Sequence, residues 1–177
     1  MKILDLLSGA SEEMQKTLVE NRLKELKNRI ETHAAGEVLD KVLEGLLEAM
    51  ALLFMINKAY RSHIRDFRAS YVICSEDGRI DVTAVFKKVS FLFIEMDGME
   101  VRDTAVDDPT VAVTFRDGKA MADFLLSGNT DVIEGMLDNQ LSVSGNLNYL
   151  FKFIYLLWLI PELLGINDLK ELLCTPA

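Results

Sequence analysis

The sequence is short of the side chains on which metal sites and much of catalysis depend. Its 177 residues include two histidines and two cysteines. Neither His33 nor His63 has a cysteine or carboxylate neighbour at a metal-ligand spacing. Cys74 and Cys174 form no CxxC pattern and no disulfide framework. We therefore expect free thiols in a reducing compartment, no metal and no cofactor.

Motifs of common catalytic sites are missing as well. The chain contains no GxSxG, no P-loop and no GxGxxG sequence. Asp103, Asp107 and Asp108 form an acidic group, but it lacks the alternating ligands and central glycine of a calcium loop. These absences favour a protein that is not an enzyme, although a site assembled from distant residues would not be visible in a sequence.

Positive charge is also scarce. The formal net charge of −9 argues against nucleic acid as a partner and against general adhesion to anionic membranes, though a local basic patch could still act. The N-terminal apolar run is short and contains Asp5, so we expect no secretory signal. Ala49–Ile56 is too short to span a bilayer, and Leu147–Leu164 is interrupted by a lysine, a proline and a glutamate. We expect a soluble, cytoplasmic protein.

Apolar residues make up 50% of the chain and charged residues 27%, which is typical of a globular protein. Apolar side chains at helical spacing predict a helix from Ser11 to Ile30, a break at His33–Gly36, and a second helix from Glu37 to about Arg65. We expect residues 1–66 to form a helical segment that packs on a domain formed by residues 67–177.

From Phe67 onward the periodicity changes to that of strands. Asp77-Gly78 and Asp97-Gly98 punctuate the first of these, and Asp-Gly is a strong hairpin signal. The predicted strands are Ala69–Ser75, Arg79–Phe86, Val89–Met96, a shorter Met99–Asp103, Val111–Phe115 and Leu141–Ser144.

Helices are predicted around the last of these strands. Lys119–Leu126 and a second short helix precede it, and Asn146 is the expected N-cap of a large apolar helix that Pro161 disturbs or ends. A small helix over Asp168–Leu173 follows. The fold class is therefore α+β, with a mainly antiparallel five-stranded sheet covered on one face by helices and an N-terminal helical extension.

The large helix after Asn146 is hydrophobic around nearly its whole circumference. Such a helix is buried on both sides, or it contacts lipid, a ligand or another subunit. One side could face a ligand tunnel between helix and sheet, or the N-terminal helices could cover it as ordinary core. The residues alone leave both alternatives open.

Four segments of the second half resemble the sterol carrier protein 2 (SCP-2) lipid-binding domain family. They are Asp108–Phe115 (DPTVAVTF), Phe124–Gly128 (FLLSG), Asn139–Asn146 (NQLSVSGN) and the apolar helix Leu147–Ile160. The resemblance extends over roughly Ala69–Ile160. It implies the SCP-2-like fold and the non-catalytic binding and transfer or presentation of an apolar lipid in a tunnel between the sheet and the C-terminal helix.

The chain also departs from this family. Asn139 and Gln140 stand where Gly-Lys is frequent, Asn146 stands where Asp is usual, and the C-terminus lacks a peroxisomal Ser-Lys-Leu. These departures favour the bacterial stand-alone type, some members of which are accessory factors in ubiquinone biosynthesis. The implied ligand is an isoprenoid or quinone precursor, a fatty-acyl chain or a sterol-like molecule.

Two groups of residues are candidates for binding. The first is the expected apolar lining of the tunnel: Phe91, Phe93, Val113, Phe115, Phe124, Leu125, Leu141, Val143, Phe151, Ile154, Tyr155 and Trp158. The second is a basic stripe, at spacings of three, four and three, for a lipid headgroup or an acidic partner: Lys58, Arg61, Arg65 and Arg68. A solvated helix face is the simpler explanation of that stripe.

A different class of function fits the same apolar helix. Without a ligand, the helix would serve as a homodimer or partner interface of a structural or interaction protein. As a carrier, the chain would instead have an apolar lipid ligand and a transient membrane-surface or enzyme partner.

Overall fold

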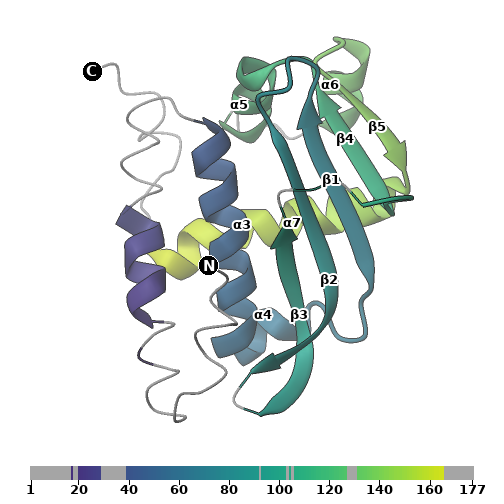
Figure 1. Cartoon of the computed structure of the whole chain (residues 1–177). Coiled ribbons are helices and arrows are strands. Elements are labelled where there is room, and N and C mark those ends of the chain that lie inside the picture. Colours follow the sequence, from purple (N-terminus) through teal and green to yellow (C-terminus); the bar gives the residue numbers. More distant parts are fainter. Residues whose placement is uncertain are drawn as a thin grey trace.

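A computed structural model describes residues 17, 20–28, 39–91, 93–102, 104, 106–126 and 131–165, without the side chains of residues 39, 40, 122, 125 and 126. Residues 20–28 are helical. The elements that follow are α3 (Leu39–Ile56), α4 (Lys58–Ser62), β1 (Ala69–Ser75), β2 (Asp81–Phe91), β3 (Ile94–Arg102), β4 (Val111–Phe115), α5 (Gly118–Leu126), α6 (Val132–Leu137), β5 (Leu141–Gly145) and α7 (Leu147–Leu164) (Figure 1). The predicted break at 33–36 and helix at 168–173 lie outside the described residues.

The second predicted helix is interrupted, which corrects the expectation that it continues to about residue 65. Asn57 separates α3 from α4, and its side-chain oxygen accepts a hydrogen bond from the backbone N–H of Tyr60 at 2.9 Å. Arg61 Nη1 donates to the carbonyl oxygens of Phe54 and Met55, at 2.7 and 2.9 Å, and so satisfies the C-terminal end of α3. The break is stabilised at both of its ends.

The prediction of a hairpin turn at Asp97-Gly98 is wrong. β2 continues through the Lys87-Lys88 pair to Phe91, and the next strand begins at Ile94, which pairs with Phe91. The predicted strand Val89–Met96 is therefore divided: its first residues, to Phe91, end β2, and its last residues, from Ile94, continue through Asp97-Gly98 to Arg102 as one strand, β3. Gly98 is needed here for space, since a Cβ atom at this position would overlap the side chain of Val89 on β2.

Asp97 takes part in an ion-pair cluster instead of a turn. Its carboxylate forms ion pairs with Lys88 Nζ at 3.0 Å and with Arg68 Nη1 at 2.9 Å. It also accepts a hydrogen bond from the backbone N–H of Asp66 at 3.2 Å. Burial raises the pKa of Asp97, but the hydrogen bonds from Lys88, Asp66 and Arg68 outweigh it and hold the pKa below its ordinary value. The cluster joins the segment after α4 to the β2–β3 hairpin.

The five strands form one sheet in the order β3-β2-β1-β4-β5. Three pairings are antiparallel, and β1 pairs with β4 in parallel, so the sheet is mixed. The parallel pairing arises because the connection after β3 passes β2 and β1 before β4 begins. Ser70 and Thr110 fix this junction through two reciprocal bonds between backbone N–H groups and side-chain hydroxyls, of 3.0 and 3.1 Å.

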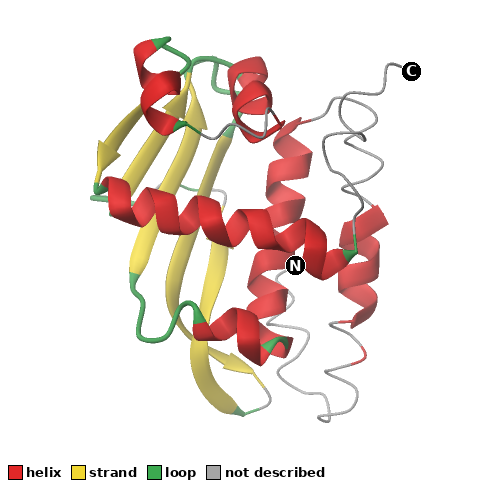
Figure 2. Cartoon of the chain, turned by 180° about the vertical axis from the view of Figure 1, so that it is seen from behind, coloured by secondary structure: helices red, strands yellow, loops and turns green. Residues whose placement is uncertain are grey.

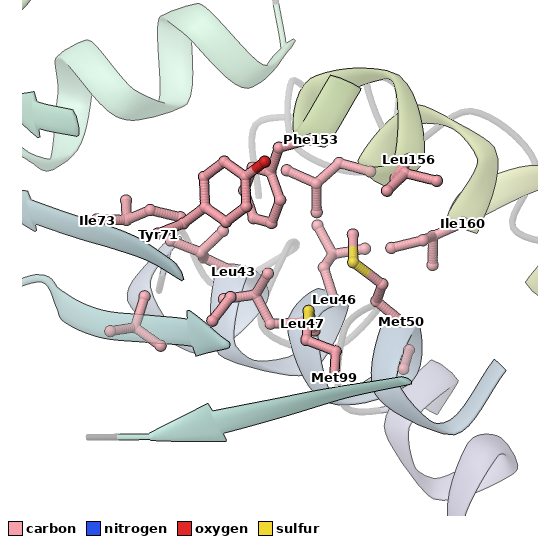
Figure 3. Packing of buried hydrophobic residues seen from close by; sticks show 14 of the residues in the cluster. Leu43, Leu46, Leu47, Met50, Tyr71, Ile73, Met99, Phe153, Leu156 and Ile160 are labelled. Carbon is pink, nitrogen blue, oxygen red and sulfur yellow. The ribbon is translucent and has the colours of Figure 1, made fainter. Parts of the chain in front are cut away.

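Helices α4, α5, α6 and α7 lie on one face of this sheet, as predicted, and α3 lies beside the β3 edge (Figure 2). No described helix covers the opposite face of the sheet (Figure 1). The core lies where α3, the sheet and α7 meet (Figure 3). Its central side chains are Leu43, Leu46, Leu47, Met50, Tyr71, Ile73, Met99, Phe153, Leu156 and Ile160. The side chains of α3, which lies before residue 66, belong to the same core as the sheet and α7. The division of the chain into two parts at residue 66 stays a prediction.

Helix α7 begins as the sequence predicts. Asn146 caps it by accepting the backbone N–H of Asn148 at 2.9 Å. Pro161 does not end it, since the helix continues to Leu164 and terminates at Gly165 with a φ of 62°. By length and composition α7 is the one helix in the described chain that could cross a membrane, yet it contributes buried side chains to the core.

Candidate functional site

An apolar cavity lies between α7, α5 and the sheet. β1, β4 and β5 form its floor, α3 closes one side, and α5 and α7 cover it. The lining residues are Leu43, Tyr71, Ile73, Val113, Phe115, Met121, Phe124, Leu141, Leu150, Phe153, Ile154 and Leu157. The strand residues in this set follow from the alternation of β1 and β4, which turns every second side chain toward α7.

The lining offers no polar group to a ligand. The one hydroxyl in it belongs to Tyr71 and already donates to the carbonyl oxygen of Tyr149 at 2.9 Å. Burial raises the pKa of Tyr71, and the neighbouring Tyr149 raises it further, so the hydroxyl stays protonated. A molecule held here would be recognised by shape and apolar contact alone.

The cavity is small as it stands. Its volume is about 30 Å³, far below the roughly 300–1,000 Å³ of typical ligand pockets. Apolar walls without hydrogen-bonding groups leave such a space dry. An acyl or isoprenoid chain would fit only after the side chains over the sheet had moved apart.

Five residues of the predicted tunnel line this cavity. They are Val113, Phe115, Phe124, Leu141 and Ile154. Val143 is half-buried beside the core without lining the cavity, and the side chain of Leu125 lies outside the described residues. A role of these residues in ligand binding stays a prediction.

The other predicted residues lie elsewhere. Phe91 is buried at the end of β2, and Phe93 is 81% exposed at the turn that follows it. Phe151, Tyr155 and Trp158 project from the outer side of α7 and are 45%, 49% and 47% exposed. The apolar character of α7 around its whole circumference therefore reflects two surfaces, of which only the inner one faces the cavity.

Several lining residues were not among the sequence candidates. Leu150, Phe153 and Leu157 recur at spacings of three and four, and this periodicity marks the inner side of α7. Tyr71 and Ile73 follow the alternation of β1, which gives a similar signal. Leu43 and Met121 follow the helical periodicity of α3 and α5, which marks a buried side of each helix but does not assign it to this cavity.

The four residues of the predicted basic stripe do not align on one helix. Arg61 is bound to the end of α3, and Arg68 is paired with Asp97. Lys58 begins α4 and Arg65 lies in the turn after it, and both are exposed. The break at Asn57 and the end of α4 at Ser62 remove the single helix on which these residues would align.

A second hollow opens at the C-terminal end of α7. It is an open groove of about 500 Å³ between residues 20–28, the end of α3 and the end of α7. Apolar residues and three lysines line it: Leu23, Lys24, Lys27, Leu53, Ile56, Asn57, Lys58, Leu163 and Leu164. Lys27 Nζ donates to the carbonyl oxygen of Gly165 at 2.9 Å, which places one lysine at the negative end of the helix dipole.

The described residues contain no group of three His, Cys, Asp or Glu side chains placed to hold a metal ion. No protein-family model and no curated protein matches the chain. A solution structure from Thermus thermophilus, of a conserved hypothetical protein called "possibly sterol carrier protein", is similar to 76% of this chain and 90% of its own, with 12% identity and a TM-score of 0.40. A TM-score this low does not establish a common fold.

Proposed function

We propose that the protein binds an apolar lipid chain without catalysing a reaction, and transfers or presents it. The observation that carries this proposal is the wholly apolar cavity between the sheet, α5 and α7. Its position agrees with what the resemblance of roughly Ala69–Ile160 to the SCP-2 family implies. The ligand class is an isoprenoid or quinone precursor, a fatty-acyl chain or a sterol-like molecule, and a role beside ubiquinone biosynthesis belongs to the same proposal.

The ligand would occupy a widened form of the cavity. Each buried methylene contributes about 0.8 kcal/mol, so a chain of about ten methylenes gains about 8 kcal/mol. Displacing packed side chains typically costs about 1–3 kcal/mol at each site. Met121 suits this movement because a thioether adapts to an irregular space, and Ile154 is only half-buried. The gain from burial, before the cost of association, therefore exceeds the cost of opening at one or two positions.

Mass spectrometry of the gently purified protein tests this proposal. The native spectrum should show a stoichiometric adduct that leaves on denaturation, and solvent extraction should identify it as a lipid. A protein that is empty, and that takes up neither a fluorescent fatty acid nor a fluorescent isoprenoid, would contradict it.

A variant then locates the site. Ile154→Trp fills the cavity and should abolish uptake while the circular dichroism spectrum stays native. Tyr155→Trp is the matched control, because Tyr155 is the next residue of α7 but projects from its outer side. If both variants take up lipid like the parent protein, the ligand does not lie in this cavity.

A further inference from the structure

The outer side of α7 carries an aromatic stripe formed by Phe151, Tyr155 and Trp158. Their spacings of four and three place them above one another on one side of the helix. Each is close to half exposed, at 45%, 49% and 47%. Rings that combine an apolar body with a polar tip, such as those of tyrosine and tryptophan, concentrate where a membrane meets water.

Helix α4 and the turn after it lie along one flank of α7. The hydroxyl of Tyr60 donates to the carbonyl oxygen of Leu156 at 2.8 Å. The ring of His63 meets that of Tyr155 edge-on, with 5.4 Å between centroids. Further along, the ring of Phe67 stacks on Tyr149 at 5.2 Å. These contacts hold the α4 segment along α7, and His63 meets the aromatic stripe at Tyr155.

The same segment carries two exposed cations. Lys58 and Arg65 are exposed, and among the described residues neither forms an ion pair. Lys58 also borders the groove at the end of α7, where Lys24 and the exposed Leu163 extend the same mixture of basic and apolar side chains. Two acids are exposed in this region: Glu162, four residues after Trp158 and so on the same side of α7, and Asp66, next to Arg65.

We propose that this face, composed of the aromatic stripe with Lys58, His63 and Arg65, docks on an anionic bilayer surface. Lys58 and Arg65 are exposed cations that form no ion pair with another described residue, in a chain whose net charge is −9. Anionic headgroups complement these cations, whereas an apolar contact with a second copy of the chain would not use them. α7 would lie in the plane of the interface, with its rings at the depth of the headgroups.

This inference does not depend on the contents of the cavity. Docking would nevertheless bring Ile154, a lining residue next to Tyr155, close to the membrane. If the protein does not bind vesicles, the proposal of a lipid site in the cavity is not contradicted. If the cavity contains no lipid, the proposal of a docking face is not contradicted.

The single tryptophan makes the test direct. Trp158 is the one tryptophan of the chain, so its emission reports the stripe alone. Vesicles of phosphatidylcholine mixed with phosphatidylglycerol should shift the emission of Trp158 to the blue and reduce its quenching by acrylamide. The protein should also sediment with these vesicles. Vesicles of phosphatidylcholine alone should do so far less, and added salt should weaken the binding.

Variants separate charge from general affinity. Lys58→Gln and Arg65→Gln should each weaken binding to the anionic vesicles roughly fivefold. Arg79→Gln, a matched loss of an exposed cation in the β1–β2 turn, should leave it unchanged. Tyr155→Ser should weaken binding on the order of tenfold, because it removes one ring from the interface. Circular dichroism confirms that each variant is folded.

Two results would overturn the proposal. In the first, the folded protein shows no change in Trp158 emission with anionic vesicles, or the Lys58 and Arg65 variants bind them no more weakly than Arg79→Gln. In the second, Trp158 is already shielded from acrylamide without vesicles, and the protein elutes as a dimer that dissociates on dilution. The second result would assign the stripe to a copy of the same chain.

Discussion

Replacing Phe153 by alanine tests the packing of α7 and the nature of the cavity together. Phe153 is 2% exposed and stacks on Tyr71 with 4.4 Å between ring centroids, and it meets Phe86 edge-on at 6.2 Å. Removing a buried phenylalanine ring costs about 3–5 kcal/mol, and the two lost ring contacts favour the upper part of that range. The loss is a large share of the stability of a domain of this size.

The same change enlarges the cavity, since Phe153 is part of its lining. An engineered apolar cavity stays dry and accepts apolar molecules. Phe153→Ala should therefore regain stability when a fatty acid is added, in proportion to the logarithm of its concentration above the dissociation constant. Chemical unfolding followed by circular dichroism, with and without the fatty acid, measures both effects.

Phe151→Ala is the control, because this ring is on the same helix but 45% exposed. It should cost about 1 kcal/mol or less. If the alanine variant of Phe153 does not fold, Phe153→Leu keeps most of the apolar volume and should lose about 1–2 kcal/mol. Equal losses at the two positions would refute the assignment of an inner and an outer side to α7. If the fatty acid does not change the stability of the Phe153 variant, the proposal that the cavity binds a lipid is refuted.

Two further predictions concern the sheet and the ion-pair cluster. Gly145 has a φ of 107°, and a Cβ atom there would overlap the carbonyl oxygen of Thr110. Gly145→Ala should therefore lower the free energy of unfolding by about 1–3 kcal/mol. An unchanged melting temperature of this variant would count against the register of β4 and β5. Asp97→Asn should lose about 1 kcal/mol at neutral pH, since the lysine and arginine bound to Asp97 are partly screened by solvent. Because the folded pKa of Asp97 is lowered, its contribution is present above the unfolded value and is lost as the pH falls through the folded one. The difference between parent and variant should narrow below about pH 4, and a difference that does not vary with pH would refute this role.

Features that depend on neighbours in the chain follow from the sequence alone. The alternation of Val111, Val113 and Phe115 predicts β4, and Asn146 predicts the start of α7, because strand pleating and helix capping involve residues a few positions apart. The α+β class and the helices on one face of the sheet follow from the order of such elements. The parallel pairing of β1 with β4 does not, since it depends on the path of the connection after β3.

Features that depend on distant contacts were decided by the tertiary structure. Asp97-Gly98 has the composition of a turn, yet Arg68 and Lys88 bind the aspartate and Val89 packs against the glycine, so the strand continues. Both sides of α7 carry large apolar side chains, and the contacts with the sheet and α5 determine which of them are buried. The same holds for the cations near α4, because Arg61 is bound to α3 while Arg65 remains exposed. Local periodicity determined which elements form, and packing between residues far apart in the chain determined where the cavity and the exposed aromatic stripe lie.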